Sequence, residues 1–201
     1  MPFRENRDSA YFMEKIKSLK AQGREREASE MAGEAAKDAR GQGREIEAKR
    51  FFKMGISRHT EEISRMKQGV YNTPIFGLIS AYGDLIGFCV RYGTEKERGH
   101  FILELEREVE SDLEKIAREK RFSAAASVAK DAGVVFDRCG DVSRYQKFIN
   151  KAIKYYAEEI KNCVAEGRYY QILDVNENIN RTMRELFDRA SRNIGHSLRK
   201  D

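Results

Sequence analysis

The run from Pro74 to Val90, PIFGLISAYGDLIGFCV, constrains the fold most, because no other long stretch of the chain is apolar on nearly all sides. Its apolar residues recur at steps of three and four, which is helical spacing. A helix that is apolar almost all round is buried in a protein or lies in a membrane. Because the run is shorter than the roughly 20 residues needed to span a bilayer and carries Asp84 near its middle, we expect it to be buried.

The opposite side of this helix carries a strip of small and polar residues, namely Gly77, Ser80, Asp84, Gly87 and Arg91. Small residues let another backbone approach closely, and glycine inside a helix costs about 1 kcal/mol without such compensation. We therefore expect a tight helix crossing along this strip. The alternative is a groove that presents Asp84 and Arg91 to a ligand.

The rest of the chain has the composition of long solvated helices. Charged residues make up 35% of the 201 residues and hydrophobic residues 40%, with no tryptophan and two prolines. No Asn-Gly or Asp-Gly hairpin signal occurs. The sequence thus predicts an all-α fold of about eight antiparallel helices, either a solenoid or a bundle, around a buried central helix at 74–91. We expect a single domain over residues 1–201, with 1–68 and 69–201 as candidate sub-halves.

Helix boundaries follow from apolar periodicity and from glycines that break it. Thr94 with Glu97 forms a capping box, and Asp141 can begin a helix. The predicted helices span residues 9–21, 25–40, 44–67, 74–91, 95–120, 123–138, 141–166 and 169–197.

The third predicted helix carries an apolar seam with steps of four, three, four and three, which are typical of antiparallel helix packing or a coiled coil. Its members are Phe52, Ile56, His59, Ile63 and Met66. We expect His59 to be a core or interfacial histidine rather than a ligand or base. The seam could also join two copies of the chain into a homo-oligomer.

No pattern of catalytic or metal-binding residues stands out. Cys89, Cys139 and Cys163 have no CxxC spacing and no nearby histidine, so they are expected to be buried thiols in a reducing cytosol. The chain lacks the two Glu-x-x-His motifs of a di-iron site, a P-loop and a dinucleotide fingerprint. We expect neither a metal nor another cofactor. Without an apolar N-terminal signal, the expected location is cytoplasmic, with no membrane partner.

Charge and aromatic residues suggest one binding patch. The net charge is +5, and basic residues prevail at both ends, but acidic residues are interspersed with them as on an ordinary soluble surface. Tyrosines and basic residues cluster around Gly167, either as a surface for a peptide or RNA bases or as rings that close a helix corner. The cluster comprises Lys151, Lys154, Tyr155, Tyr156, Arg168, Tyr169 and Tyr170.

The segment from Phe122 to Glu159 resembles a tetratricopeptide-type helix pair, nearest to that of vesicle-fusion adaptors of the SNAP type. The resemblance rests on Ala126, Ala129, Gly133, Phe136, Gly140-Asp141 and Ala152. It implies an α-solenoid scaffold whose concave face binds a peptide or helix of another protein, and it implies no catalytic residue.

The end of the last helix is similar to the motif of HEPN ribonucleases, in which an arginine and a histidine four to six residues apart cleave RNA. The matching residues are Arg189 or Arg192 with His196. The alternative is a helix end whose cationic side chains favour the negative end of the dipole.

The sequence therefore predicts a non-enzymatic interaction module, an adaptor or assembly factor that binds another protein or itself beside the last three helices. The alternative is an RNA-binding protein or HEPN-like ribonuclease.

Overall fold

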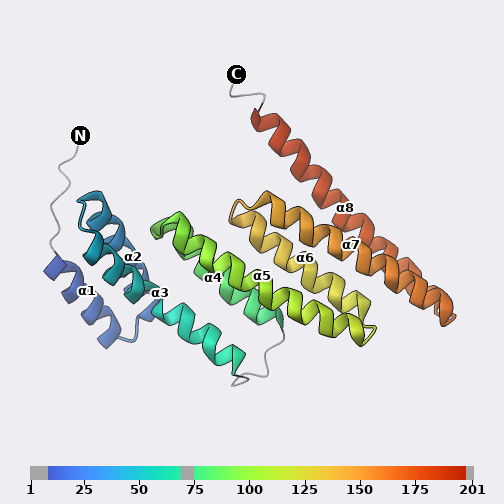
Figure 1. Cartoon of the computed structure of the whole chain (residues 1–201), viewed down its shortest axis with the longest axis horizontal. Coiled ribbons are helices and arrows are strands. Elements are labelled where there is room, and N and C mark those ends of the chain that lie inside the picture. The colour runs from blue at the N-terminus through green and yellow to red at the C-terminus, as the bar shows by residue number, and fades with distance from the viewer. Residues whose placement is uncertain (1–8, 69–74, 198–201) are drawn as a thin grey trace. The chain divides into compact units, whose positions relative to one another are not determined.

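The computed structural model describes residues 9–68 and 75–197, with all of their side chains except those of residues 186 and 189–197. These residues form eight α-helices and no strand (Figure 1), which confirms the predicted all-α fold. The helices are α1 (Ser9–Ala21), α2 (Glu25–Gly41), α3 (Glu45–Lys67), α4 (Ile75–Tyr92), α5 (Glu95–Arg118), α6 (Phe122–Arg138), α7 (Val142–Ala165) and α8 (Tyr169–Ser197). Thr73 and Pro74, the predicted start of α4, lie outside the described residues.

Four of the connections use the same glycine turn. In each, the glycine has a left-handed backbone with φ between 71° and 77°, and the next N–H bonds to the carbonyl five residues back, as Arg24 does to Leu19 at 2.9 Å. This closure satisfies the last carbonyls of the helix, and glycine adopts the required φ without a clash of a Cβ. The glycines are those that the sequence analysis identified as breaks: Gly23, Gly43, Gly140 and Gly167.

The turn between α5 and α6 has the same geometry without a glycine. Lys120 has a φ of 57°, and the N–H of Arg121 bonds to the carbonyl of Ile116 at 3.2 Å. A left-handed lysine is uncommon because its Cβ crowds the backbone. The α5–α6 turn is therefore the strained member of a repeated set.

Two predicted helix starts are confirmed. The N–H of Thr94 donates to the carboxylate of Glu97 at 2.7 Å, and the N–H of Glu97 donates to the hydroxyl of Thr94 at 3.2 Å, which completes the capping box. At α7, the N–H of Arg144 donates to Oδ1 of Asp141 at 3.0 Å. Both caps satisfy amides that have no partner within the helix.

The chain divides into two compact units, residues 1–105 and 106–201, and the division falls inside α5. The expectation of one all-helical domain stays a prediction. In the first unit α4 packs against α2 and α3. The seam of α3 faces α4, because the rings of Phe52 and His59 lie 6.0 and 5.7 Å from that of Phe88.

The tight crossing in this unit lies at α2 and α3 rather than along the glycine strip of α4. A Cβ on Gly33 would stand 2.5 Å from the ring of Tyr92, and the Ser29 hydroxyl donates to the Gly55 carbonyl at 2.5 Å. A Cβ on Gly87, by contrast, would meet nothing within 4 Å. The prediction of a close crossing along the strip of α4 is thus wrong, since α4 contributes large rings that fill a gap between glycines on other helices.

One side of α4 stays open. Phe76, Ser80, Asp84, Val90 and Arg91 are exposed. Among the described residues, α4 alone is long and apolar enough to cross a membrane, and 39% of it is buried inside the protein. Its buried side carries the core contacts expected of this helix.

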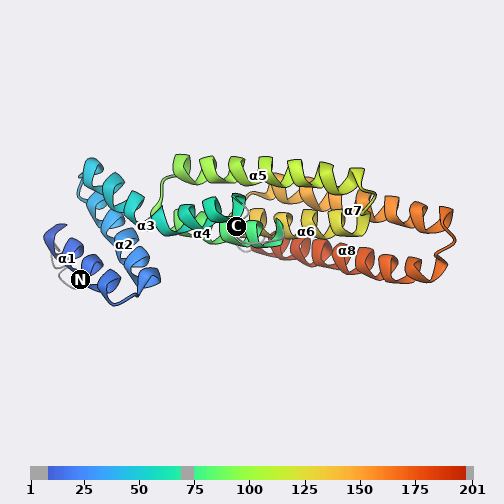
Figure 2. The ribbon, with the colours of Figure 1, turned by 90° about the horizontal axis from the view of Figure 1, so that it is seen from below.

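In the second unit, α6, α7 and α8 run side by side (Figures 1 and 2). Small residues of α6 let α7 approach, and a Cβ on Gly133 would stand 3.1 Å from Ile149. The rings of Phe136 and Phe148 stack with centroids 5.1 Å apart. The buried alanines of this contact include Ala125, Ala126, Ala129, Ala132 and Ala152.

Ion pairs join α5 to α7. Glu106 accepts from Arg144 at 2.6 Å and from Lys147 at 2.5 Å, while Glu110 accepts from Lys151 at 2.9 Å. An acidic run along α5, typical of a solvated face, comprises Glu104, Glu106, Glu108, Glu110 and Asp112, but Glu106 and Glu110 pair with α7 instead. Glu106 and Glu110 stand four positions apart and share one face of α5, while the acidic residues between and beside them lie on another face.

Candidate functional site

Helix α8 buries one face against α6 and α7. Val175 is 5% exposed and packs in a cluster with Ala126 and Tyr156. The Thr182 side chain is also buried, and its hydroxyl donates to the carbonyl of Asn178 at 2.8 Å. Ile179 packs partly buried at the edge of the same cluster. This inner face explains why α8 is amphipathic.

A second apolar face of α8 has no cover in the described structure. Leu173 and Phe187 are each 74% exposed, Tyr169 is 64% exposed, and Met183 is 49% exposed. Monomeric proteins rarely leave several large apolar side chains of one helix face in water. We call this face the outer stripe; its positions, at steps of four, three, four, three and four, are Tyr169, Leu173, Asn176, Asn180, Met183 and Phe187.

Four charged residues border the outer stripe between Leu173 and Phe187. They are Asp174 and Glu177 in its first half and Arg181 and Arg184 in its second half. Among the described side chains none of the four forms an ion pair, although Glu177 and Arg181 stand one helical turn apart; Arg181 instead donates to Asn178 at 2.7 Å. Glu185 differs, because it pairs with Lys130 of α6 at 2.9 Å.

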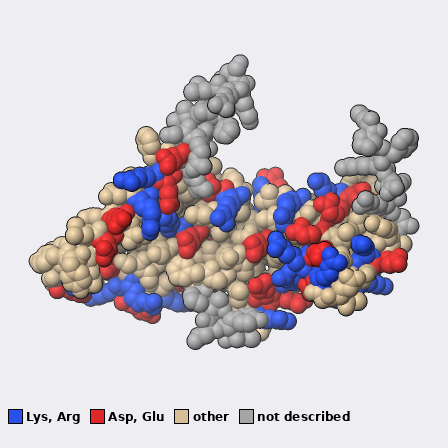
Figure 3. All heavy atoms as spheres, turned by 180° about the vertical axis from the view of Figure 1, so that it is seen from behind, with Lys and Arg blue, Asp and Glu red and all other residues tan. Residues whose placement is uncertain are grey.

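The aromatic and basic cluster predicted around Gly167 is divided by the structure. Lys154, Tyr169 and Tyr170 are exposed. Figure 3 shows an uncharged area where α7 meets α8, on the left in that view. Three members therefore remain open to a partner.

The other four members serve the fold. Tyr156 is buried in the cluster with Val175. Lys151 pairs with Glu110, and Arg168 pairs with Glu166 at 2.6 Å and with Glu159 at 3.7 Å. Tyr155 is partly buried, and this burial, with the nearby charges of Glu114 and Glu110, raises its pKa. These four residues thus help to close the corner between α7 and α8, which was the alternative interpretation of the cluster.

Asp84 and Arg91 both lie on the open side of α4. Arg91 pairs with Glu30 of α2 at 2.8 Å, and the same carboxylate accepts from the hydroxyl of Tyr92 at 2.8 Å. Burial, and the hydrogen bond that the Tyr92 hydroxyl donates to Glu30, raise the pKa of Tyr92. Arg91 thus contributes to an ion pair between helices.

The ribonuclease-like residues Arg189, Arg192 and His196 fall on the last turns of α8, where the backbone is helical but the side chains lie outside the described residues. The alternative role in RNA cleavage stays a prediction.

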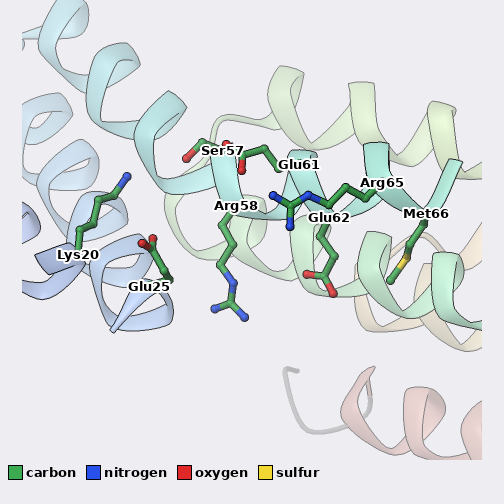
Figure 4. Close-up of a pocket in the computed structure, with 8 residues that line it drawn as sticks. All are labelled: Lys20, Glu25, Ser57, Arg58, Glu61, Glu62, Arg65 and Met66. Carbon is green, nitrogen blue, oxygen red and sulfur yellow. The ribbon is translucent and has the colours of Figure 1, made fainter. Parts of the chain in front are cut away.

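A hollow of about 760 Å³ lies among α1, α2 and α3 (Figure 4). Lys20 and Glu25 face it from the α1–α2 turn, and the opposite wall belongs to α3. Its charges balance, because Lys20, Arg58 and Arg65 are matched by Glu25, Glu61 and Glu62. Among the described residues no group of His, Cys, Asp and Glu could hold a metal ion.

The outer stripe was not predicted from the sequence, because no role was assigned to Leu173 or Phe187. The sequence did contain a signal for it. Helix α8 carries two neighbouring rows of heptad-spaced apolar residues, and packing one face against α6 and α7 accounts for only one row.

Comparison with known proteins adds no assignment. No family model, no curated protein and no solved structure matches the chain.

Proposed function

We propose that this protein is a non-enzymatic interaction module that uses the outer stripe of α8 to bind a helix of another protein chain. The observation that carries the proposal is the exposure of Leu173 and Phe187, each 74% open to water on the same face of one helix. In stacked-helix proteins the outermost helix needs a polar outer face for solubility. An apolar outer face on α8 fits a surface that a partner covers.

The spacing of the stripe indicates the shape of the partner. Heptad steps place Leu173, Asn180 and Phe187 in a row that matches a second α-helix lying along α8. The two asparagines within the stripe can bond to polar groups of the partner and fix its register. A flat or extended partner would not follow this row.

The helical-repeat nature of the scaffold is part of the proposal. It is supported by the sequence of α6 and α7, whose resemblance residues Ala126, Ala129, Phe136 and Ala152 are all buried where the two helices meet. The scaffold would hold α8 in place and leave its outer stripe for the partner.

A photo-crosslinking amino acid placed at Leu173 tests this function. We expect it to form a covalent product with a protein chain, and the same group at Asn150, an exposed position of α7, to form none. The product should disappear when Phe187→Ser is added, while the helical circular dichroism spectrum stays unchanged. Absence of any protein product from position 173, with purified protein and with cell extract, would overturn the proposal.

A further inference from the structure

We infer that the helix covering the outer stripe belongs to a second copy of this chain, with the two α8 helices antiparallel around a two-fold axis near residues 178 and 179. The inference rests on the proposed function, because it names the occupant of the same surface. Three features of the described part of α8 lead to it: the order of its charges, the order of its apolar residues and the absence of ion pairs along the border.

The charges along the border are self-complementary. Asp174 and Glu177 precede Arg181 and Arg184 by seven residues each, which is one heptad. In an antiparallel pair centred between residues 178 and 179, Asp174 lies within one residue of the level of Arg184 of the second copy, and Glu177 lies within one residue of the level of Arg181 of the second copy. The two-fold axis repeats both pairs, as in any isologous contact. All four charges of each copy thereby gain a partner of opposite sign.

The same arrangement matches the stripe. The same axis, between residues 178 and 179, sets Leu173 within one residue of the level of Met183 of the second copy, and Tyr169 within one residue of the level of Phe187 of the second copy. Asn176 then lies level with Asn180 of the second copy. Side-chain amides both donate and accept, so these asparagines can bond to each other inside an apolar contact.

A parallel pair in register lacks this complementarity. It would bring the acidic half of one border beside the acidic half of the other, and the basic halves together likewise. Like charges across an interface act against association. The charge order therefore favours the antiparallel pair.

The charges of the border are available for such contacts. Asp174, Glu177, Arg181 and Arg184 are exposed, and among the described side chains none is paired with an opposite charge. Glu185, which points to α6 rather than to the stripe, already has Lys130. Unpaired charges thus coincide with the uncovered apolar face.

A contact of one helix from each chain is small, so we expect a dimer with a dissociation constant on the order of 10 µM. Light scattering after size exclusion, from about 1 µM to about 500 µM, should show the mass rise from one chain to two. A mass of one chain throughout this range would overturn the inference.

Charge exchange tests the pairing. The variant Asp174→Arg/Glu177→Arg has basic residues at all four of these positions, and Arg181→Glu/Arg184→Glu has acidic residues at all four. Each should dimerise roughly a hundredfold more weakly than the wild type, since the attractive pairs become repulsive. An equimolar mixture of the two should dimerise again, and so should the chain with all four substitutions. Failure of both to recover would overturn the inference.

Cysteine pairing tests the orientation. The three native cysteines are buried, so a disulfide between chains would report an introduced thiol. A mixture of Leu173→Cys and Met183→Cys should give a disulfide-linked pair of one chain of each kind, while Leu173→Cys alone should give little. Dominant self-linking of Leu173→Cys would indicate a parallel pair and overturn the antiparallel arrangement.

The results separate this inference from the proposed function. If the crosslinker at position 173 captures a different protein and the wild type stays a single chain, the second copy is ruled out and the interaction module stands. If position 173 captures nothing and the mass stays that of one chain, both proposals fail.

Discussion

Gly55 of α3 lies directly beneath the ring of Phe88 of α4. A Cβ built on Gly55 would stand 2.5 Å from Cζ of Phe88 and 3.2 Å from the carbonyl oxygen of Ser29 on α2. Because Phe88 is fully buried, its ring has no free space into which it could move. Helices α2, α3 and α4 thus meet at Gly55, where the absence of a side chain leaves room for the ring of Phe88.

Gly55→Ala should therefore destabilise the protein. We expect a loss of about 2 kcal/mol in the free energy of unfolding, because overpacking a filled core forces side chains and backbone to shift. The matched control is Gly87→Ala, where a Cβ meets nothing within 4 Å and the helix should gain about 0.5–1 kcal/mol. Urea unfolding of both variants checks the prediction, and equal stabilities would contradict it.

Lys120→Gly should stabilise the protein. The φ of 57° at Lys120 suits glycine, which has no Cβ to crowd the backbone, so we expect a gain of about 0.5–1 kcal/mol. The reverse change at the matching turn, Gly140→Ala, should lose a similar amount. Glu119→Gly, one residue earlier, serves as the control and should bring no gain. Thermal unfolding of the three variants measures their order of stability. If Lys120→Gly is less stable than the wild type, the backbone at Lys120 is not strained.

Local signals explain why the helices could be predicted from the sequence. The amphipathic spacing, the capping pairs at Thr94 and Asp141 and the glycine breaks are each contained within a few residues. The α5–α6 turn shows the limit of this approach, since Lys120 adopts the glycine conformation without the glycine. At this turn the residue type therefore does not indicate the left-handed backbone, whereas at the four glycine turns it does.

Contacts between helices explain what the sequence could not predict. Glycine positions on α4 suggested a close crossing there, but the structure has it at Gly33 and Gly55. Which helix covers which face depends on residues far apart in the chain. For the same reason the ion pair of Glu106 with Arg144 could not be predicted, since the two residues lie 38 positions apart in the chain.

The pairing of Glu106 should make stability depend on acid. Burial alone would raise its pKa, but hydrogen bonds from Lys147 and Arg144 outweigh burial and hold the pKa below the ordinary 4.5. A depressed pKa in the folded state contributes stability that is present above pH 4.5 and is lost as the pH falls through the lower folded value.

Glu106→Gln should thus lose about 1–2 kcal/mol at pH 7 and much less near pH 3. Urea unfolding at the two pH values measures the difference. Glu14→Gln, an exposed position on α1, is the control and should stay within about 0.5 kcal/mol of the wild type at both. A loss that is the same at pH 3 and pH 7 would show that shape rather than charge matters at Glu106.

His59 should produce a second pH dependence at milder acidity. Its burial lowers its pKa from the ordinary 6.5, and its ring lies against that of Phe88. The unfolded chain then binds the proton more readily, so stability should decrease as the pH falls below 6.5 and level off below the folded pKa. Unfolding midpoints between pH 8 and pH 5, measured for wild type and His59→Gln, should converge toward low pH; parallel curves would contradict this.

The two faces of α8 should respond oppositely to the same kind of change. Val175→Ser removes a buried side chain from the cluster with Ala126 and Tyr156 and should lose about 2 kcal/mol of stability. Leu173→Ser changes a side chain that is 74% exposed and should stay within about 0.5 kcal/mol of the wild type when measured on dilute protein. Guanidinium unfolding of both variants at low concentration tests the assignment. A large loss for Leu173→Ser in the monomer would show that the outer stripe is part of the chain's own core, and no free surface for a partner would then remain on α8.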